Sequence, residues 1–224
     1  MNTRQQSVSN FLLVSKRERW RLAFWGWLVV VAAAGAAGLF GIQQLHGFLS
    51  VDIAVESELL VVEGWIPDDA LKRAKSEFEK NDYQLLIVVG GPLRLGSHLS
   101  QFKNYARLAQ ARLSEMGFEK EKIVEVETSD VKNDRTYEAA QAVKRWIAAN
   151  SVRVKGLNVY TLGAHARRSR LLFKKVFGNE VDVGVIAAPD ESYDPANWWQ
   201  SSNGAKTVGS ELIAYIYAVL FFHP

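Results

Sequence analysis

A histidine followed three residues later by an arginine is the feature of this sequence best suited to chemistry. His165 and Arg168 come just after the apolar run Leu157–Leu162 and Gly163, and Ser169 follows them. An unperturbed imidazole titrates near pH 6.5, so His165 could donate or accept a proton near neutrality. An arginine at a helix start could hold a phosphate or carboxylate with its planar guanidinium. The block predicts a site for an anion, although a lone histidine more often serves only as a structural hydrogen-bonding group.

Glycines follow two other apolar runs. Gly64 comes after Leu59–Glu63, and the pair Gly90 and Gly91 comes after Leu85–Val89. Because glycine has no side chain, its backbone can approach a ligand closely, although a glycine pair alone is more often a tight turn. We expect the amides of these loops to contribute to the same anion site.

A second arginine stands at another expected helix start. Arg135 and Thr136 follow the third apolar run, and Asp134 beside them is expected to cap the helix. Free amides at a helix N-terminus attract anions. Glu63 and Glu211 are the acids expected to orient His165. The candidate catalytic residues are His165 and Glu63. The candidate ligand-binding residues are Gly64, Gly90, Gly91, Arg135, Thr136, Arg168, Ser169 and Glu211.

Composition excludes several classes of site. The sequence has no cysteine, which rules out disulfides, thiol catalysis and zinc–thiolate centres. Its four histidines lack metal-ligand spacing, so we expect no histidine-rich metal site, and no motif suggests a metal or a cofactor. A magnesium ion held by carboxylates stays open as an alternative. No Gly-x-Ser-x-Gly elbow or P-loop is present, which argues against an ordinary serine hydrolase or NTPase. The formal charge is only +3, so nucleic acid is not expected as a partner.

The elements that must position these residues alternate between strand and helix. Continuous apolar runs that stop at glycine or proline are typical of buried strands. The predicted strands are Leu59–Glu63, Leu85–Val89, Leu157–Leu162 and Val181–Ala187, together with Lys122–Glu127, whose alternating apolar and charged residues predict a half-exposed strand. The predicted helices are Pro67–Glu79, Ser97–Met116, a helix from Asn133 or Asp134, Ala166–Phe177 and Lys206–Phe222. This order predicts an α/β fold with a doubly wound, mainly parallel, Rossmann-like sheet, in which ligands bind at the carboxyl ends of the strands.

An uncharged run precedes this domain. Leu22–Ile42 carries no charge and is long enough to cross a membrane of about 30 Å. Basic residues precede it, at Lys16, Arg17, Arg19 and Arg21, which predicts a cytoplasmic N-terminus. We therefore expect a cytoplasmic basic segment over 1–21, one transmembrane anchor over 22–45 and an extracytoplasmic domain over 50–224. A cleaved signal peptide is the alternative, because the small residues within the run could supply a cleavage site.

The chemistry-bearing blocks together resemble the YdcF-like family of bacterial envelope proteins, which includes SanA and ElyC. The resemblance covers about residues 57–222 and rests on Gly90-Gly91, Arg135-Thr136-Tyr137-Glu138, His165-Ala166-Arg167-Arg168-Ser169 and Glu211. Arg135 stands where the family usually has asparagine. The resemblance implies a Rossmann-like domain, often membrane-anchored, with a role in cell-wall or envelope-polymer biogenesis. It implies no established reaction.

Residues and resemblance together give the expected function. We expect a single-pass protein of the bacterial inner membrane whose periplasmic domain binds an anionic, phosphate-bearing ligand such as a lipid-linked glycan precursor. The expected partners are the membrane, this ligand and envelope-assembly proteins. Whether the chain is an enzyme stays open. The alternatives are a non-catalytic module for a nucleotide-like ligand and an assembly module of a membrane complex.

Overall fold

The computed structural model describes residues 22–94, 96 and 99–223. The expected cytoplasmic segment 1–21, with its basic residues, lies outside the described residues, and so does Ser97, the expected cap of the second helix.

The first helix, α1, is longer than the uncharged run that predicted it. It spans Phe24–Leu49, a length of about 39 Å at 1.5 Å per residue, and is apolar and long enough to cross a membrane. The chain divides into two compact units, Met1–Phe40 and Gly41–Pro224. The last turns of α1 therefore belong to the second unit, whose expected start was residue 50. Leu49 is fully buried there.

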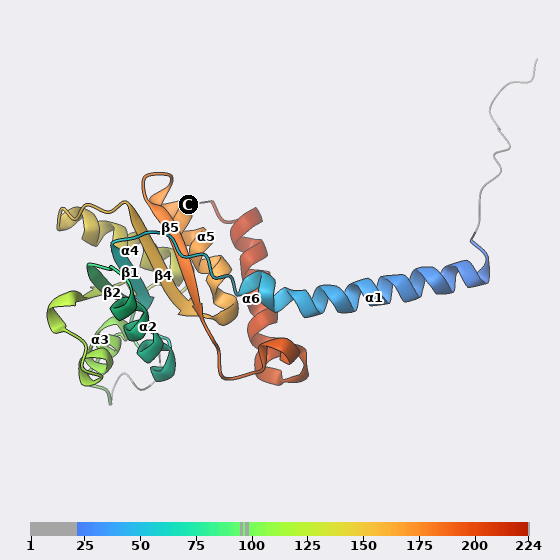
Figure 1. Cartoon of the computed structure of the whole chain (residues 1–224), viewed down its shortest axis with the longest axis horizontal. Coiled ribbons are helices and arrows are strands. Elements are labelled where there is room, and N and C mark those ends of the chain that lie inside the picture. Colours follow the sequence, from blue (N-terminus) through green and yellow to red (C-terminus); the bar gives the residue numbers. More distant parts are fainter. Residues whose placement is uncertain (1–21, 95, 97–98, 224) are drawn as a thin grey trace, which may run out of the picture. The chain divides into compact units, whose positions relative to one another are not determined.

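The second unit is built on a five-stranded sheet in which every pairing is parallel (Figure 1). The strand order is β3-β2-β1-β4-β5. The strands are β1 (Leu59–Glu63), β2 (Leu85–Gly90), β3 (Ile123–Glu127), β4 (Gly156–Leu162) and β5 (Asp182–Ala188). This order confirms the predicted α/β fold with a doubly wound parallel sheet.

Helices cover both faces of the sheet. The helices α2 (Asp68–Lys80) and α3 (Tyr105–Glu115) pack on one face, and α4 (Arg135–Ala149) and α5 (Ala166–Phe177) pack on the other. The last helix, α6 (Ser202–Leu220), packs beside α5. Short 3₁₀ turns, η1 (Lys120–Lys122), η2 (Gly163–His165) and η3 (Pro195–Gln200), complete the connections.

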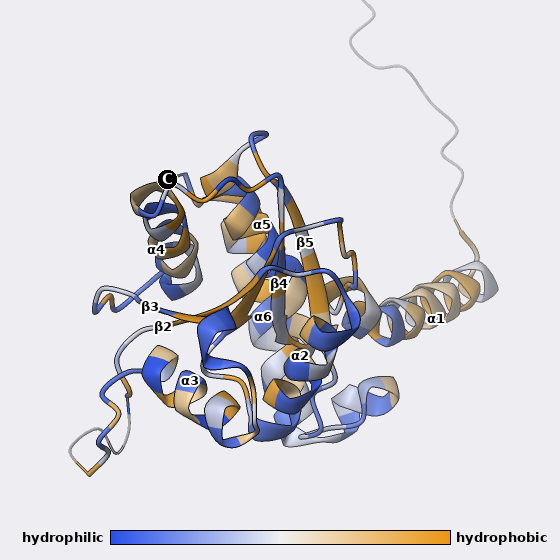
Figure 2. Cartoon of the chain, turned by 60° about the vertical axis from the view of Figure 1, so that its left-hand side comes forward, coloured by the Kyte–Doolittle hydropathy of each residue, from blue (hydrophilic) through white to orange (hydrophobic). Residues whose placement is uncertain are grey.

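Burial on both faces explains why β1 and β2 are nearly continuous apolar runs. In β1, Leu59 and Val61 face the core beneath α4 and α5, whereas Leu60 and Val62 face the core beneath α2 and α3. All four side chains are fully buried. Figure 2 colours most of β5 as hydrophobic. When helices cover both faces of a parallel sheet, neither face meets water, so apolar and polar residues do not alternate along the strands.

Two predicted helix starts are wrong. The smaller error is that α6 begins at Ser202, with Ser201 as its cap, instead of at Lys206. The helix expected from Ser97 begins at Tyr105, and the described residues before it, 91–94, 96 and 99–104, are not in a helix. Asn104 caps the helix, because its side chain accepts a hydrogen bond from the backbone N–H of Arg107 at 2.8 Å. A bridge pairs Pro92 with Asn104. The helical spacing of apolar residues therefore starts before the helix itself, at Leu99 and Phe102.

A neutral polar cluster lies near the amino-terminal ends of the strands. Asn158 on β4 is almost fully buried. Its Oδ1 accepts from the N–H of Val55 at 2.9 Å, and its Nδ2 donates to the carbonyl of Val55 at 2.8 Å. The same Nδ2 lies 2.9 Å from Ser57 Oγ and 3.0 Å from Tyr83 Oη. We call these four residues the asparagine cluster; it fixes the segment that leads from α1 into β1.

Candidate functional site

The opposite end of the sheet carries a cavity. The chain leaves β1 toward β2 on one side, and β4 pairs with β1 on the other, so the strand order changes direction between β1 and β4. Such a point opens a crevice beyond the carboxyl ends of the strands. A cavity of about 1190 Å³ lies at this edge, lined by Glu63 at the end of β1 and His165 just after β4. Its volume is ample for a small-molecule ligand.

The cavity brings together most of the residues singled out in the sequence. Those that line it are Glu63, Gly90, Gly91, Arg135, Thr136, His165, Arg168 and Glu211. Gly64 and Ser169 are not among the lining residues. A Cβ on Gly64 would lie 2.7 Å from the carbonyl oxygen of Tyr105, and one on Gly90 would lie 2.7 Å from its Cβ. Both glycines therefore let the start of α3 lie against the sheet, which accounts for them without a ligand.

Glu63 is a buried carboxylate held by hydroxyl donors. Thr161 donates a hydrogen bond to Glu63 Oε2, and Ser169 Oγ donates to the same oxygen at 3.4 Å. The Nε2 atom of His165 also lies 3.4 Å from it. Burial alone would raise the pKa of Glu63, but the charge of His165 and these hydrogen bonds hold it below its ordinary value. Glu63 is therefore ionised at neutral pH.

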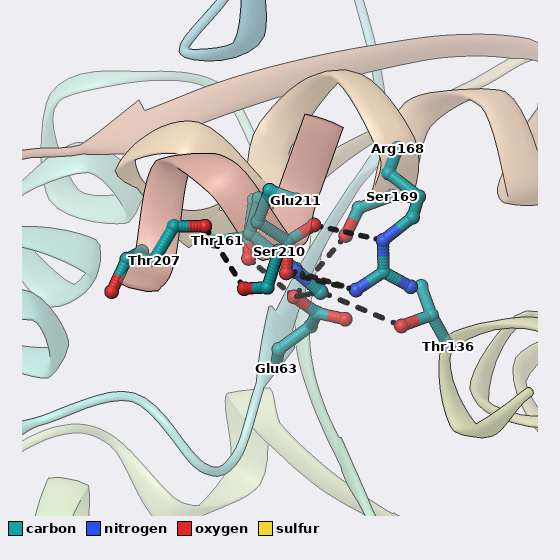
Figure 3. A network of polar contacts seen from close by, with 9 residues as sticks. Glu63, Thr136, Thr161, Arg168, Ser169, Thr207, Ser210 and Glu211 are labelled. Atoms are coloured by element: carbon teal, nitrogen blue, oxygen red, sulfur yellow. Dashed lines mark hydrogen bonds and ion pairs between the residues drawn. The ribbon is translucent and has the colours of Figure 1, made fainter. Parts of the chain in front are cut away.

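His165 lies between two carboxylates. Its Nδ1 is 2.9 Å from Glu211 Oε1, and its Nε2 faces Glu63 and, at 3.4 Å, Thr136 Oγ1. Figure 3 shows Arg168 reaching toward the carboxylate of Glu211 in the same network. Burial lowers the pKa of His165, yet Glu63 and Glu211 outweigh that effect and raise it to about 9. The ring is thus an imidazolium at pH 7, in which both nitrogens carry protons. His165 is a proton donor there, and its pKa is not the unperturbed value that the sequence suggested.

Arg168 is already paired within the protein. Its Nε donates to Glu211 Oε2 at 2.8 Å and its Nη2 donates to Glu211 Oε1 at 3.0 Å, a two-pronged pair. Burial raises the pKa of Glu211, but His165 and Arg168 lower it to about 2. The shared carboxylate also offsets the repulsion between guanidinium and imidazolium, whose nearest nitrogens are 3.0 Å apart. Arg168 therefore fixes Glu211, and the expected anion clamp at this residue is not what its contacts show.

We call Glu63, His165, Arg168 and Glu211 the charged cluster. Its two carboxylates and two cations balance, so the cluster as a whole attracts no anion. It draws on four elements, because Glu63 ends β1, His165 ends η2, Arg168 lies in the first turn of α5 and Glu211 lies in α6.

Uncompensated positive charge lies elsewhere on the cavity wall. Arg94, Lys132 and Arg135 line it, together with the acids Asp130 and Asp134. Within the part of the chain that the structure describes, neither Arg94 nor Arg135 forms an ion pair. Partial burial, followed by the charge of Arg94, lowers the pKa of Arg135. Two guanidiniums held near one another without a carboxylate partner are the cations of this cavity best able to receive an anion.

Asp134 does not act as the expected cap. It occupies the N-cap position of α4 with a left-handed backbone, φ 53°, and its side chain makes no capping hydrogen bond. The amides at the start of α4 are thus not covered by this carboxylate.

Sequence reasoning missed three contributors to the site. Trp65 lines the cavity and meets the ring of His165 edge-on, with centroids 5.2 Å apart. Thr161, a polar residue inside a buried strand, was the available signal for a partner of Glu63. Arg94 follows the glycine pair within a few residues, yet the loop around it gives no periodic pattern to mark it.

The remaining wall is apolar. Leu172 of α5 lines it together with Ala214, Tyr217 and Ala218 of α6, and Phe222 follows them. The cavity is therefore cationic and polar on the side of the strand ends and apolar on the side of α6.

Among the described residues, no group of three or more histidine, aspartate or glutamate side chains could hold a metal ion.

Comparison with known proteins adds no relative. No protein-family model matches the chain, and no curated protein matches it. The likeness to the YdcF-like family therefore stands on the sequence blocks quoted above.

Proposed function

We propose that this chain is a membrane-anchored, extracytoplasmic factor of cell-envelope biogenesis that binds an anionic, phosphate-bearing ligand. One observation carries the proposal: Arg94 and Arg135 line the same cavity as the protonated His165, and neither arginine has a carboxylate partner among the described residues. A phosphate group would supply the missing negative charge and accept hydrogen bonds from all three side chains.

His165 would serve this ligand as a proton donor. Glu211 holds its Nδ1, so Nε2 is the nitrogen with the longer and weaker contacts. A phosphate oxygen beside Nε2 would receive a hydrogen bond or, in a reaction, the proton of a leaving group. Arg168 and Glu63 would act as positioning residues that keep the imidazolium charged and oriented.

The apolar wall supports a ligand with a hydrophobic part. Tyr217, Ala218 and Phe222 line the same cavity as the charged cluster. An anionic head beside Arg135 and an apolar chain along α6 would suit both walls, as a lipid-linked glycan precursor would. The uncharged run and its basic flank, together with the resemblance to envelope proteins, support the bacterial inner membrane as the location.

A reporter fusion tests the location. A C-terminal reporter that works only outside the cytoplasm should be active, because the basic N-terminal flank favours an N-in, C-out orientation. An inactive but well-expressed fusion would contradict this orientation.

Thermal unfolding of the full chain in detergent tests the ligand. Inorganic pyrophosphate, a sugar nucleotide and a short-chain phosphatidic acid are the probes, and binding at about 100 times Kd should add about 2.7 kcal/mol of stability. Arg135→Ala should weaken the binding of the effective probe about 10- to 100-fold, as expected for lost charge-assisted hydrogen bonds. Arg73→Ala is the matched control, because Arg73 is exposed on α2 and its partner is Glu191. Equal affinity in the two variants would refute the cation site.

A non-catalytic binding role is the second candidate, and one observation favours it. The buried hydroxyls of Thr161 and Ser169 both donate to Glu63, so neither is poised as a nucleophile. His165→Gln distinguishes the two roles, since an enzyme would lose turnover while retaining most of its ligand affinity. A binding module would show no turnover with any probe, in the wild-type chain or in the variant.

A further inference from the structure

The second half of α6 exposes an apolar stripe that the domain does not cover. Ile213 is 71% exposed, Ile216 43% and Leu220 59%, and the spacing of these residues places them on one side of the helix. Tyr217 and Phe221 flank the stripe, with exposures of 48% and 67%. Scattered exposed apolar residues are ordinary, but a contiguous set on one helix face marks an interaction surface.

The other side of α6 is occupied by the domain and by the end of α1. Val208 is fully buried in a cluster with Leu49, and Leu45 and Leu212 pack against that cluster. The ring of Phe48 lies 5.6 Å from that of Tyr215 in an edge-on contact. The stripe therefore belongs to a helix that directly contacts the end of α1.

Chain connectivity identifies what this stripe can reach. Leu45 comes three residues after Ile42, where the uncharged run ends. Three residues span at most about 11 Å even when fully extended. A bilayer crossed by the uncharged run would therefore have its surface within a short distance of the residues that hold α6.

The composition of the stripe suits the boundary between lipid and water. Tyr217 and Phe221 stack with ring centroids 6.2 Å apart at the carboxyl end of the helix. Aromatic side chains concentrate at membrane interfaces, and an amphipathic helix can bury its apolar side in the headgroup region. By contrast, the first half of α6 carries Asn203, Lys206 and Ser210, and these remain exposed.

We propose that the stripe formed by Ile213, Ile216, Tyr217, Leu220 and Phe221 lies on the lipid bilayer beside the anchor. This inference rests on the membrane anchoring proposed above. It also deepens the proposed function, because Tyr217 lines the cavity as well as flanking the stripe. The second half of α6 would then contact the membrane and also form the apolar wall of the cavity. An acyl or prenyl chain could enter the cavity from the adjacent lipid.

Site-specific labelling tests the contact, and the absence of cysteine from the sequence makes it direct. Ile216→Cys in the full chain carries an environment-sensitive fluorophore, and the chain is reconstituted in phosphatidylcholine–phosphatidylglycerol vesicles. Lys80→Cys, at an exposed position on α2, is the matched control. Nitroxide-labelled lipid should quench the probe at residue 216 several-fold more than the probe at residue 80, whereas aqueous iodide should show the reverse order.

Each other outcome overturns the inference. Equal iodide quenching at residues 216 and 80 would mean that the stripe faces water. Protection at residue 216 from both quenchers would mean that a second copy or another protein covers it. Ile213→Cys repeats the measurement in case the first label disturbs the fold, which circular dichroism checks.

Failure of this inference is separable from failure of the proposed function. Quenching requires no ligand, so it does not depend on the cation site. A chain that does not float with the vesicles would refute the anchor and, with it, the stripe contact. A chain that floats but leaves residue 216 open to iodide would refute the stripe contact alone.

Discussion

The two ends of the sheet hold two buried polar clusters of opposite character. The asparagine cluster, at the amino ends of the strands, is neutral, and its four residues are absent from the lining of the cavity at the opposite edge. The charged cluster, at the carboxyl ends, holds four ionised groups and lines that cavity. Both clusters join segments far apart in the sequence.

The comparison distinguishes a cluster that stabilises the fold from one that belongs to the candidate site. Neutral hydrogen bonds are an inexpensive way to join Val55 to Asn158 inside a protein, since no ion must leave water. Burying carboxylates and cations costs several kcal/mol per ion, so pairing them is a poor way to gain stability alone. We therefore assign the asparagine cluster to the fold, and we treat the charged cluster as the part of the proposed site that keeps His165 charged and oriented.

The largest expected effect tests whether the charged cluster is as tightly paired as its contacts indicate. Glu63→Ala should lower the free energy of unfolding by about 3–5 kcal/mol, because it leaves two hydroxyls and a buried imidazolium without their partner. Urea unfolding of the full chain in detergent, followed by circular dichroism, measures this. Glu63→Gln, which keeps the shape, should lose less; an unchanged Glu63→Ala would show that the pairing contributes nothing.

Between pH 2 and 9, the titration of His165 and Glu211 in the charged cluster should make the stability of the fold depend on pH. The folded pKa of His165 is about 9 against an ordinary 6.5, so its stabilisation is complete below pH 6.5 and is lost as the pH rises through 9. Glu211 has a folded pKa of about 2 against 4.5, so its stabilisation is present above pH 4.5 and is lost as the pH falls through 2. Unfolding free energies should therefore be highest between pH 4.5 and 6.5 and fall by a few kcal/mol toward pH 9.

Two variants test whether His165 causes this fall of the unfolding free energy with pH. His165→Gln should flatten the decline above pH 6.5, because it removes the group that titrates. Asn158→Ala should retain the decline at lower overall stability. The same slope in His165→Gln would mean that another group causes it.

A smaller loss of stability is expected from the neutral cluster. Asn158→Ala leaves the N–H and carbonyl of Val55 without these partners and should cost about 1–3 kcal/mol. Its affinity for the effective phosphate probe, measured by titration, should equal that of the wild-type chain. Weaker binding would mean that the two ends of the sheet are coupled and that the division proposed above is wrong.

The smallest effect should come from Arg168→Lys. Lysine keeps the charge opposite Glu211 but cannot form the two-pronged pair, so a loss of about 1 kcal/mol in unfolding free energy is expected. Ligand affinity should change little, because Arg168 is occupied by Glu211. A loss of affinity as large as that of Arg135→Ala would return Arg168 to the role of anion clamp.

Much of this fold was readable from the sequence for a physical reason. Strands buried on both faces appear as uninterrupted apolar runs, and Gly178 stops α5 where a stop was expected. The parallel arrangement then brings the residues after β1, β2 and β4 to one edge, so their convergence on a cavity followed without any contact being known. The start of α3 was missed because Asn104 caps the helix later than the apolar spacing suggests.

The chemistry of the site was less readable, because it depends on partners chosen in three dimensions. Arg168 and Glu211 are 43 positions apart, and no local pattern shows that one fully engages the other. The pKa of His165 depends on its burial between carboxylates from β1 and α6. The sequence therefore indicated which residue types form the site. The charge of His165, and the finding that Arg94 and Arg135 form no ion pair among the described residues, came only from the packed structure.

The segment between α1 and β1 is not a flexible linker, because contacts with the domain hold it along its length. Leu49 is buried at the helix end, Ile53 bridges to Val185 in β5, and Asn158 holds Val55. If the uncharged run crosses a membrane, as proposed, this segment offers no slack that would let the domain move far from the bilayer. The encounters of the domain would occur in two dimensions, with molecules that diffuse in the bilayer or settle on its surface.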